Sequence, residues 1–236
     1  FVYNVDSELR QTVLSGQGEL HLHVSIDRLK RRFNVEVETF KPRIPYRETI
    51  RGKGASKYRH KKQSGGAGQF AEVWMKVEPK SRGEGVEFSH SLVGQNVDRV
   101  FVPSVEKGVN AAVAEGVLAG YRVVDLKAEF YDGKQHPVDS KDIAFQMAGK
   151  QAFREAFLAA QPCLLEPVLN IEIKVPEHYM GDVMGDISSR RGKIIGMDTD
   201  GTFQQIKAQV PQSELYHYST RLRSLTGGRG IHSEEF

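Results

Sequence analysis

Residues 51–70 read RGKGASKYRHKKQSGGAGQF, a basic run that leads directly into a glycine-rich segment. Ala71–Val77 then alternates apolar and polar residues, which indicates a β-strand. Within this stretch, Gly66-x-Gly68-x-x-Ala71 formally matches a dinucleotide-binding fingerprint. That fingerprint requires an apolar strand before the glycines and a helix after them, and neither is predicted here. The stretch therefore predicts a basic glycine loop joined to a sheet, and not a dinucleotide-binding fold.

The positive charge of the chain is concentrated in this stretch. The whole chain carries a net charge of +3. Residues 51–69 contribute +6, from six Lys or Arg and no acidic residue, so the other residues sum to −3. Lysine and arginine attract phosphates, and glycines let backbone N–H groups approach them closely. The pattern favours an anionic partner met at one place, while a solvated loop is the plainer explanation of a charge run taken alone.

Length and composition indicate two or three domains. The chain has 236 residues, of which 39% are hydrophobic and 27% are charged. Cys163 is its only cysteine, so an internal disulfide is impossible and a reducing, cytoplasmic location fits. No apolar run has the length of a membrane span, and no signal peptide is visible. Phe1-Val2-Tyr3 is typical of the middle of a strand, so we expect a fragment of a longer protein.

Residues 1–40 predict the second half of a small α/β sandwich, in the order strand, strand, helix, strand. Glu19–Val24 alternates like a strand, Ile26–Phe33 has helical spacing, and Val35–Glu38 alternates again. The first of these segments places three potential metal ligands, Glu19, His21 and His23, on one face. No further strong ligand accompanies them, so we interpret this face as solvent-exposed.

Prolines at 42, 45, 162 and 167 divide the rest of the chain into two further units. In residues 41–161 we expect strands at 46–50, 71–77, 86–92 and 123–131, a helix from Pro103, and a largely buried helix at 141–160 that Ser140 caps. In residues 162–236 we expect strands at 168–175, 193–197, 203–210 and 231–236 and helices at 177–191 and 213–225. This last order is β-α-β-β-α-β, the ferredoxin-like split βαβ arrangement. The predicted fold class is therefore α+β and multi-domain.

The segment from Gln135 to Ser140 carries a histidine and an aspartate before a predicted helix. His136 and Asp139 could form an acid–base pair, because histidine titrates near neutral pH. No nucleophile, metal ligand or second histidine accompanies them, and the sequence contains no other catalytic motif. We therefore interpret Asp139 and Ser140 as helix-start residues and His136 as a contact residue on a short loop.

Two features of the predicted helix 177–191 bear on function. Gly181 and Gly185 lie four residues apart, which we interpret as close packing of the helix on its sheet. Arg190 and Arg191 end the helix, where they could meet phosphate or could complement the helix dipole. We expect Gly192 to stop the helix at its C′ position.

Several motifs along the chain, in this order, resemble bacterial translation elongation factor G. They are Ser15-Gly16-Gln17-Gly18-Glu19-Leu20-His21-Leu22, Tyr46-Arg47-Glu48-Thr49, Gln63-Ser64-Gly65-Gly66-Ala67-Gly68-Gln69-Phe70, His136-Pro137-Val138-Asp139-Ser140, Leu165-Glu166-Pro167, Tyr179-Met180-Gly181-Asp182-Val183, Arg190-Arg191-Gly192 and Leu222-Arg223-Ser224. The resemblance covers the whole chain and implies three domains of that family. Residues 1–40 would be the end of domain III, 41–161 domain IV of the ribosomal-protein-like type, and 162–236 domain V.

The resemblance also implies where RNA is met. In domain IV, an elongated arm, tip loops at 57–70 and 132–140 would contact the ribosome through Lys61, Lys62, Gln63, Ser64, Gly65, Gly66, Ala67, Gly68, Gln69, His136, Pro137 and Asp139. In domain V the contacts would be Tyr179, Asp182, Ser188, Arg190 and Arg191. Ala67 stands where many members have arginine, which removes a charge and a forked donor and suggests a paralogue.

The implied function is GTP-dependent translocation of tRNA and mRNA during elongation, as part of a translational GTPase. The sequence has no GxxxxGK[ST] loop, so GTP and magnesium would bind in a GTPase domain that is absent here, and this chain needs no cofactor or metal. The expected partners are the ribosome, its rRNA, and the tRNA and mRNA of the A site, with no membrane or DNA partner and a monomeric state. A paralogue acting in ribosome recycling or protection, and a stand-alone RNA-binding module, remain alternatives.

Overall fold

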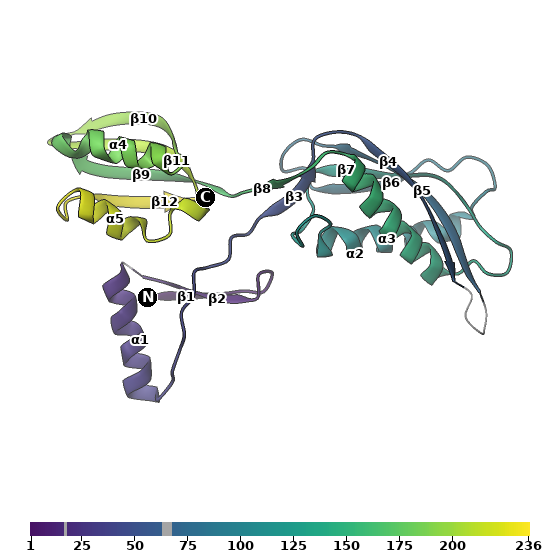
Figure 1. Cartoon of the computed structure of the whole chain (residues 1–236), viewed down its shortest axis with the longest axis horizontal. Helices are drawn as coiled ribbons and strands as arrows, with labels where there is room; N and C mark the ends of the chain where they lie inside the picture. Colours follow the sequence, from purple (N-terminus) through teal and green to yellow (C-terminus); the bar gives the residue numbers. More distant parts are fainter. Residues whose placement is uncertain (17, 63–67) are drawn as a thin grey trace. The chain divides into compact units, whose positions relative to one another are not determined.

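Figure 1 shows the chain as a computed structural model, which describes residues 1–16, 18–62 and 68–236. The tip residues Gln63, Ser64, Gly65, Gly66 and Ala67 lie outside the described residues. The chain divides into a central unit, Tyr46–Leu165, and a terminal unit, Phe1–Pro45 with Glu166–Phe236. Helices and sheets occur in both units, which confirms the α+β class. Among the described residues, none of the helices combines the length and apolar character needed to cross a membrane.

The central unit contains a four-stranded sheet. Its strands, in spatial order, are β4 (Gly54–Lys62), β5 (Gln69–Pro79), β7 (Leu126–Lys134) and β6 (Val86–His90). β6 and β7 are parallel, and the other neighbours are antiparallel. A second, two-stranded sheet pairs β3 (Arg47–Ile50) with β8 (Pro162–Leu165), and with it the compact unit runs to Leu165.

Two helices of the central unit pack against each other and against the sheet. A 3₁₀ turn, Arg99–Phe101, leads into α2 (Val102–Glu115), and α3 (Asp142–Ala159) follows β7. Small residues permit the close packing, because a Cβ at Gly108 of α2 would lie only 2.1 Å from the carbonyl oxygen of Gln146 in α3. Along α3, the alanines at 144, 148, 152 and 156 are all fully buried.

The prediction that α3 is largely buried holds for one side of the helix only. Its alanine stripe and the rings of Phe145, Phe153 and Phe157 face the core, but Ile143 and Met147 are each 47% exposed. The helix is therefore one-sided, because only one of its faces meets the sheet and α2. That single face still anchors the sheet rigidly, since packed interiors resist displacement.

The N-terminal segment differs most from expectation. It contains a hairpin of β1 (Val2–Asp6) and β2 (Gln11–Ser15), followed by one helix, α1 (Glu19–Phe33). The predicted strand at Glu19–Val24 was wrong, because these residues form the first turns of α1. The predicted strand at Val35–Glu38 has no regular structure. Period-two alternation over six residues is also compatible with a helix, and here the neighbouring helical pattern extends over it.

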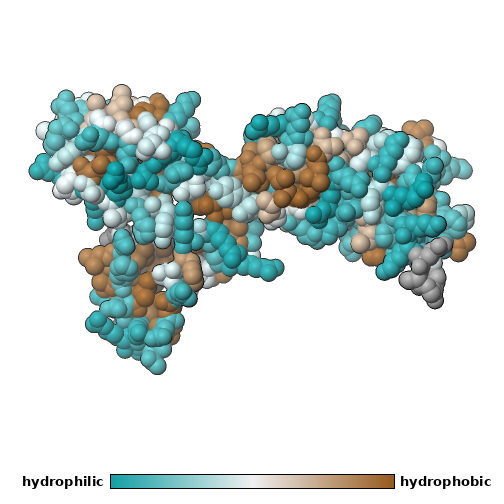
Figure 2. Space-filling model, in the orientation of Figure 1, coloured by the Kyte–Doolittle hydropathy of each residue, from teal (hydrophilic) through white to brown (hydrophobic). Residues whose placement is uncertain are grey.

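This N-terminal segment contributes nothing to the two hydrophobic cores of the described residues. Instead it exposes apolar side chains, and Figure 2 shows brown surface over this part of the chain. The exposed set comprises Phe1, Val2, Tyr3, Val5, Leu20, Val24, Phe33, Val35, Val37 and Phe40. Its strands and helix therefore lack the buried apolar face that normally stabilises such elements.

The C-terminal segment has the predicted ferredoxin-like arrangement. Its strands are β9 (Val168–Pro176), β10 (Lys193–Asp200), β11 (Phe203–Pro211) and β12 (Ile231–Glu235), in the antiparallel order β10-β11-β9-β12. The first and third strands are therefore the central pair, as the split βαβ motif requires. Side chains of α4 (Met180–Ser189) and α5 (Tyr218–Leu225) join the sheet in one core. Each helix follows a 3₁₀ turn, at Glu177–Tyr179 and Gln212–Glu214, and so begins later than predicted.

The end of α4 is built differently from the prediction. Arg191, and not Gly192, adopts the left-handed conformation, with φ of 59°. Gly192 donates its N–H to the carbonyl of Ile187 at 3.0 Å. A Cβ at Gly192 would lie 2.6 Å from Cγ2 of Ile187, so glycine is required there by close packing and not by its backbone angles.

Candidate nucleic-acid interface

Most of the described part of the basic stretch forms a strand, β4, and not a loop. β4 pairs with β5 from Gly54 opposite Val77 to Lys62 opposite Gln69. The predicted tip loops 57–70 and 132–140 were therefore too long, because β4 continues to Lys62 and β7 to Lys134. A lysine-rich segment can form a strand because the ladder uses backbone groups only, while the long side chains extend into water.

The hairpin end and the segment between β7 and α3 are bonded together, and we call their described residues the tip: Lys61, Lys62, Gly68, Gln69 and 135–140. The backbone N–H of Phe70 donates to the carbonyl of Asp139 at 2.9 Å. The hydroxyl of Ser140 donates to the carbonyl of Phe70 at 2.8 Å. A Cβ at Gly68 would lie 2.8 Å from the carboxylate carbon of Asp139, so the two segments touch.

His136 is held by its own loop. Its backbone N–H donates to the Ser140 hydroxyl at 2.9 Å, and its Nδ1 lies 3.3 and 3.2 Å from the backbone nitrogens of Val138 and Asp139. Two N–H donors directed at Nδ1 favour the tautomer with the ring proton on Nε2. The side chain is 50% exposed, and its Nε2 has no hydrogen-bond partner among the described residues. The ring is thus oriented while one donor stays available to a ligand.

The remaining tip residues differ in how freely they can reach a partner. Lys61, Lys62 and Pro137 are exposed, whereas Asp139 is half-buried beside His136, with their Oδ2 and Nδ1 atoms 3.6 Å apart. The Gln69 side chain meets His60 across the hairpin, with Oε1 and Nε2 at 3.1 Å. The tip therefore offers two free cations and one oriented imidazole.

The predicted helix-start roles of Asp139 and Ser140 were wrong. α3 begins at Asp142, and its N-cap Lys141 makes no side-chain capping bond. Asp139 and Ser140 instead connect the two tip segments. Local sequence could not reveal this, because their partner Phe70 is about seventy residues away along the chain.

In the C-terminal segment, Tyr179 is largely occupied by packing. It is partly buried and packs against the core of the C-terminal segment. Asp182 and Ser188 of α4 are exposed, and the Ser188 hydroxyl donates to the carbonyl of Met184 at 2.9 Å. Of these three predicted contacts, Asp182 and Ser188 are the ones that a partner could reach directly.

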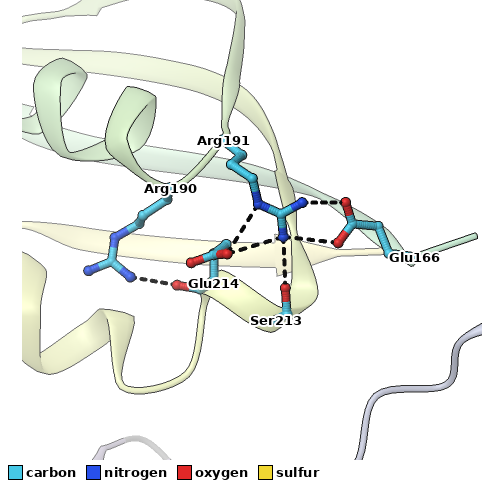
Figure 3. Close-up of polar contacts among 5 residues, drawn as sticks. All are labelled: Glu166, Arg190, Arg191, Ser213 and Glu214. Atoms are coloured by element: carbon cyan, nitrogen blue, oxygen red, sulfur yellow. Dashed lines mark hydrogen bonds and ion pairs between the residues drawn. The ribbon is translucent and has the colours of Figure 1, made fainter.

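The two arginines at the end of α4 are engaged within the terminal unit (Figure 3). Arg190 donates from Nε to Asp186 at 2.8 Å and from a terminal nitrogen to the carbonyl of Glu214 at 2.5 Å. Its guanidinium also lies 5.0 Å from the ring centre of Tyr218, and its side chain is only 19% exposed. Arg190 therefore stabilises α5 against α4.

Arg191 makes a forked pair with Glu166, at 2.6 and 3.0 Å, and also contacts Ser213 and Glu214 (Figure 3). Hydrogen bonds from Glu166 and Glu214 raise the pKa of Arg191 above its ordinary value. Its side chain remains 53% exposed. The two carboxylates neutralise the charge that a phosphate would need, so a phosphate would have to compete with them.

The two glycines of α4 face open space. The interpretation that Gly181 and Gly185 allow close packing on the sheet was wrong, since a Cβ at either position would meet no atom within 4 Å. Gly181 is the second residue of α4, whereas Gly185 lies in the helix interior, where glycine costs about 0.5–1 kcal/mol relative to alanine. Gly181, Asp182, Gly185 and Ser188 together form a surface without large side chains, which we call the glycine face of α4.

The described residues contain no group of three or more His, Cys, Asp and Glu arranged to hold a metal ion. Glu19, His21 and His23 do not all share a face, because in α1 Glu19 and His23 lie one turn apart on the same side while His21 projects to nearly the opposite side.

Comparison with known proteins covers the whole chain. Residues 1–41, 42–161 and 163–236 match three protein families, described as Elongation Factor G, domain III, Elongation factor G, domain IV, and Elongation factor G C-terminus. A crystal structure of a protein from Thermus thermophilus is 38% identical over 100% of this chain, with a TM-score of 0.83. The chain spans about a third of that protein, 35% of its length. Three family matches in consecutive order, one of them covering half of the chain, show that this protein belongs to the elongation factor G family.

Proposed function

We propose that this chain is the ribosome-binding C-terminal part of a translational GTPase that promotes translocation of tRNA and mRNA. GTP and Mg²⁺ are assigned to a domain outside this sequence, because it has no GxxxxGK[ST] loop. The role of the chain is then mechanical, and its partners are rRNA and the tRNA–mRNA pair of the A site, in the cytoplasm. Membership of the elongation factor G family supports this proposal.

The observation that carries the proposal is the construction of the tip. Its two segments are bonded through Phe70 and Ser140, and the second of them leads into α3, whose alanine stripe is fully buried. A force applied at the tip therefore reaches a close-packed helix and sheet, which deform little. Lys61 and Lys62 supply phosphate attraction, and the oriented imidazole of His136 can donate to or stack on a nucleotide.

The glycine face of α4 supports a second RNA contact. Gly185 reduces helix stability, and neither Gly185 nor Gly181 brings a packing benefit inside the terminal unit. An RNA backbone that approaches the helix more closely than a side chain would permit accounts for glycine at these two positions. We therefore assign the domain V contact to Gly181, Asp182, Gly185 and Ser188, with Arg190 and Arg191 supporting the fold beneath.

His136→Ala in the intact factor tests the tip. The tip hypothesis expects single-turnover translocation to slow by about tenfold, as the loss of one hydrogen bond of ~1.4 kcal/mol would give, while ribosome-dependent GTP hydrolysis stays near normal. His90→Ala, at another exposed histidine of the central unit, is the matched control and should leave both rates unchanged. If hydrolysis fell and translocation per GTP did not, the mechanical role of the tip would be wrong.

A related factor that acts in ribosome recycling or protection remains the second candidate. The replacement of the commoner arginine by Ala67, which lies outside the described residues, favours it. A side-by-side assay of subunit splitting and translocation with the intact factor separates the two functions. Splitting activity without translocation would replace our first proposal by this one.

A further inference from the structure

The central sheet carries aromatic and basic side chains on the face that its helices do not cover. Alternate residues of β5 such as Val73 and Met75 are fully buried against the core. The residues between them project to the opposite side, together with their cross-strand neighbours on β4 and β7. We call this set the aromatic–basic face: Lys57, Arg59, Trp74, Lys76 and Tyr131.

The two rings of this face lie side by side. Trp74 and Tyr131 meet edge to face, with ring centres 6.0 Å apart. A β-bulge places them together, because Trp74 pairs with Asp132 and Met75 pairs with Phe130, which leaves Tyr131 as the extra residue. Lys57 lies over the Trp74 ring at 3.8 Å and Lys76 over the Tyr131 ring at 4.3 Å. Both rings are only half-buried and both lysines are exposed.

Glu72 fixes the orientation of the Trp74 side chain. Its indole N–H donates to Glu72 at 2.8 Å, and Arg59 donates to the other oxygen of Glu72 at 2.6 Å. Burial alone would raise the pKa of Glu72, but these hydrogen bonds hold it below the ordinary value. The indole is therefore held by an ionised carboxylate, and its ring needs no reordering to receive a flat ligand.

The charge of the face favours an anionic partner. The outward positions of β4 hold Lys57, Arg59 and Lys61 at every second residue, without an acidic residue among them. The acidic residues of β5 are already paired, Glu72 with Arg59 and Glu78 with Lys53 at 2.9 Å. On β7, Glu129 lies opposite Lys76 and accepts from the Ser91 hydroxyl, and Asp132 lies opposite Trp74 and accepts from the backbone N–H of Gly133. A flat ring flanked by exposed ammonium groups suits a nucleotide, whose base stacks and whose phosphate is negative.

We propose that the aromatic–basic face binds single-stranded RNA, with a base stacked on Trp74 and adjacent phosphates met by Lys57 and Lys76. A stacked base contributes more than an exposed lysine–ring contact, so the base displaces Lys57 from the ring and frees its ammonium for phosphate. Duplex RNA cannot bind in this way, because its bases are enclosed between the strands. The proposal concerns the flank of the sheet, not the tip, and it does not depend on translocation.

The single tryptophan of the chain makes the proposal directly measurable. Titration of the whole chain with a short oligouridylate should quench the Trp74 fluorescence in a saturable way. Anisotropy of the same RNA carrying a label should give the same dissociation constant. A duplex of matched length should bind without this quenching.

Variants at two positions, Trp74 and Lys57, identify the contacting groups. Trp74→Leu should weaken single-strand binding by about tenfold or more, whereas Trp74→Phe, which keeps a ring, should retain most of it. Lys57→Ala should weaken binding, and Lys107→Ala, which removes an exposed lysine of α2, should not. Circular dichroism confirms folding, and Lys57→Ala keeps the test valid if a Trp74 variant unfolds.

Three results would overturn the proposal. The first is RNA binding at saturation with unchanged Trp74 fluorescence, and the second is a Trp74→Leu variant that binds as tightly as the wild type. The third is His136→Ala abolishing the quenching, which would place the RNA at the tip. None of these depends on translocation, so failure of the proposed function and failure of this inference are separately recognisable.

Discussion

Replacing Glu48 by glutamine should destabilise the central unit severely. Glu48 is fully buried in β3, yet its carboxylate accepts four backbone N–H groups from one loop. Oε2 accepts from Val117 and Leu118 at 2.6 and 2.8 Å, and Oε1 accepts from Ala119 and Tyr121 at 2.7 and 3.0 Å. The Glu48 carboxylate therefore supplies the hydrogen-bond acceptors that a helix or a sheet would otherwise supply to the backbone of the loop that follows α2.

The expected loss of stability follows from counting the hydrogen-bond acceptors that glutamine keeps. Glutamine retains one oxygen, which can serve two of the four N–H groups, while its NH₂ group faces the other two. A buried donor without an acceptor costs about 1–3 kcal/mol, so two of them cost about 2–6 kcal/mol. That is comparable with the whole stability of a domain, about 5–15 kcal/mol. With a urea m-value of about 2 kcal/mol/M, a loss of ~4 kcal/mol lowers the midpoint by ~2 M.

Urea unfolding followed by Trp74 fluorescence measures this loss, because the only tryptophan lies in the same unit as Glu48. Glu106→Gln, at an exposed glutamate of α2, is the matched control and should stay within about 0.5 kcal/mol of the wild type. A Glu48→Gln variant within that same margin would refute the reasoning, since the four bonds would then contribute little.

The pH dependence supplies an independent check on Glu48. Burial raises its pKa, but the backbone hydrogen bonds from residues 117–119 and 121 outweigh burial and hold the pKa below the ordinary 4.5. A pKa lowered by folding contributes stability that is complete above the ordinary value and is lost as pH falls through the lowered one. The difference between wild type and Glu48→Gln should thus be constant from about pH 7 to about 5 and shrink only in more acidic solution.

Three further substitutions test the terminal unit and the tip. Gly185→Ala should raise the free energy of unfolding by about 0.5–1 kcal/mol, because the added methyl group meets no atom and alanine favours helix; thermal unfolding checks this. In the same assay Gly192→Ala should lower it by about 1–3 kcal/mol, since its Cβ would overlap Ile187. Ser140→Ala removes the bonds to Phe70 and His136, and it should speed amide hydrogen exchange at His136 by about tenfold, a loss of ~1.4 kcal/mol.

The strands and helices of the C-terminal segment were predictable because each has a sustained pattern. In the strand Val168–Pro176, buried and more exposed residues alternate over nine positions. The helices of this segment have apolar residues at helical spacing. The N-terminal prediction failed at Glu19–Val24, where six alternating residues fit a strand and a helix equally well. Which of the two forms depends on what the segment packs against, and a short pattern does not contain that information.

At the tip, the sequence predicted which residues take part but not the hydrogen bonds between them. The sequence itself shows the concentration of lysines at 57–62 and the presence of His136 beside a loop. That Ser140 joins Phe70 to His136, and does not cap α3, follows from pairing between segments far apart in sequence.

Arg190, Arg191 and Trp74 show the same difference between what the sequence predicts and what the tertiary structure decides. Residue type and spacing establish what a side chain can do: an arginine can bind phosphate, and an outward tryptophan can stack. Whether it remains free to do so depends on its neighbours in space, here Asp186 and Glu166 for the arginines and a β-bulge that brings Tyr131 to Trp74. Local alternation and helical spacing act over a few residues, whereas charge pairing and sheet register bring together residues tens of positions apart, so only the folded chain sets them.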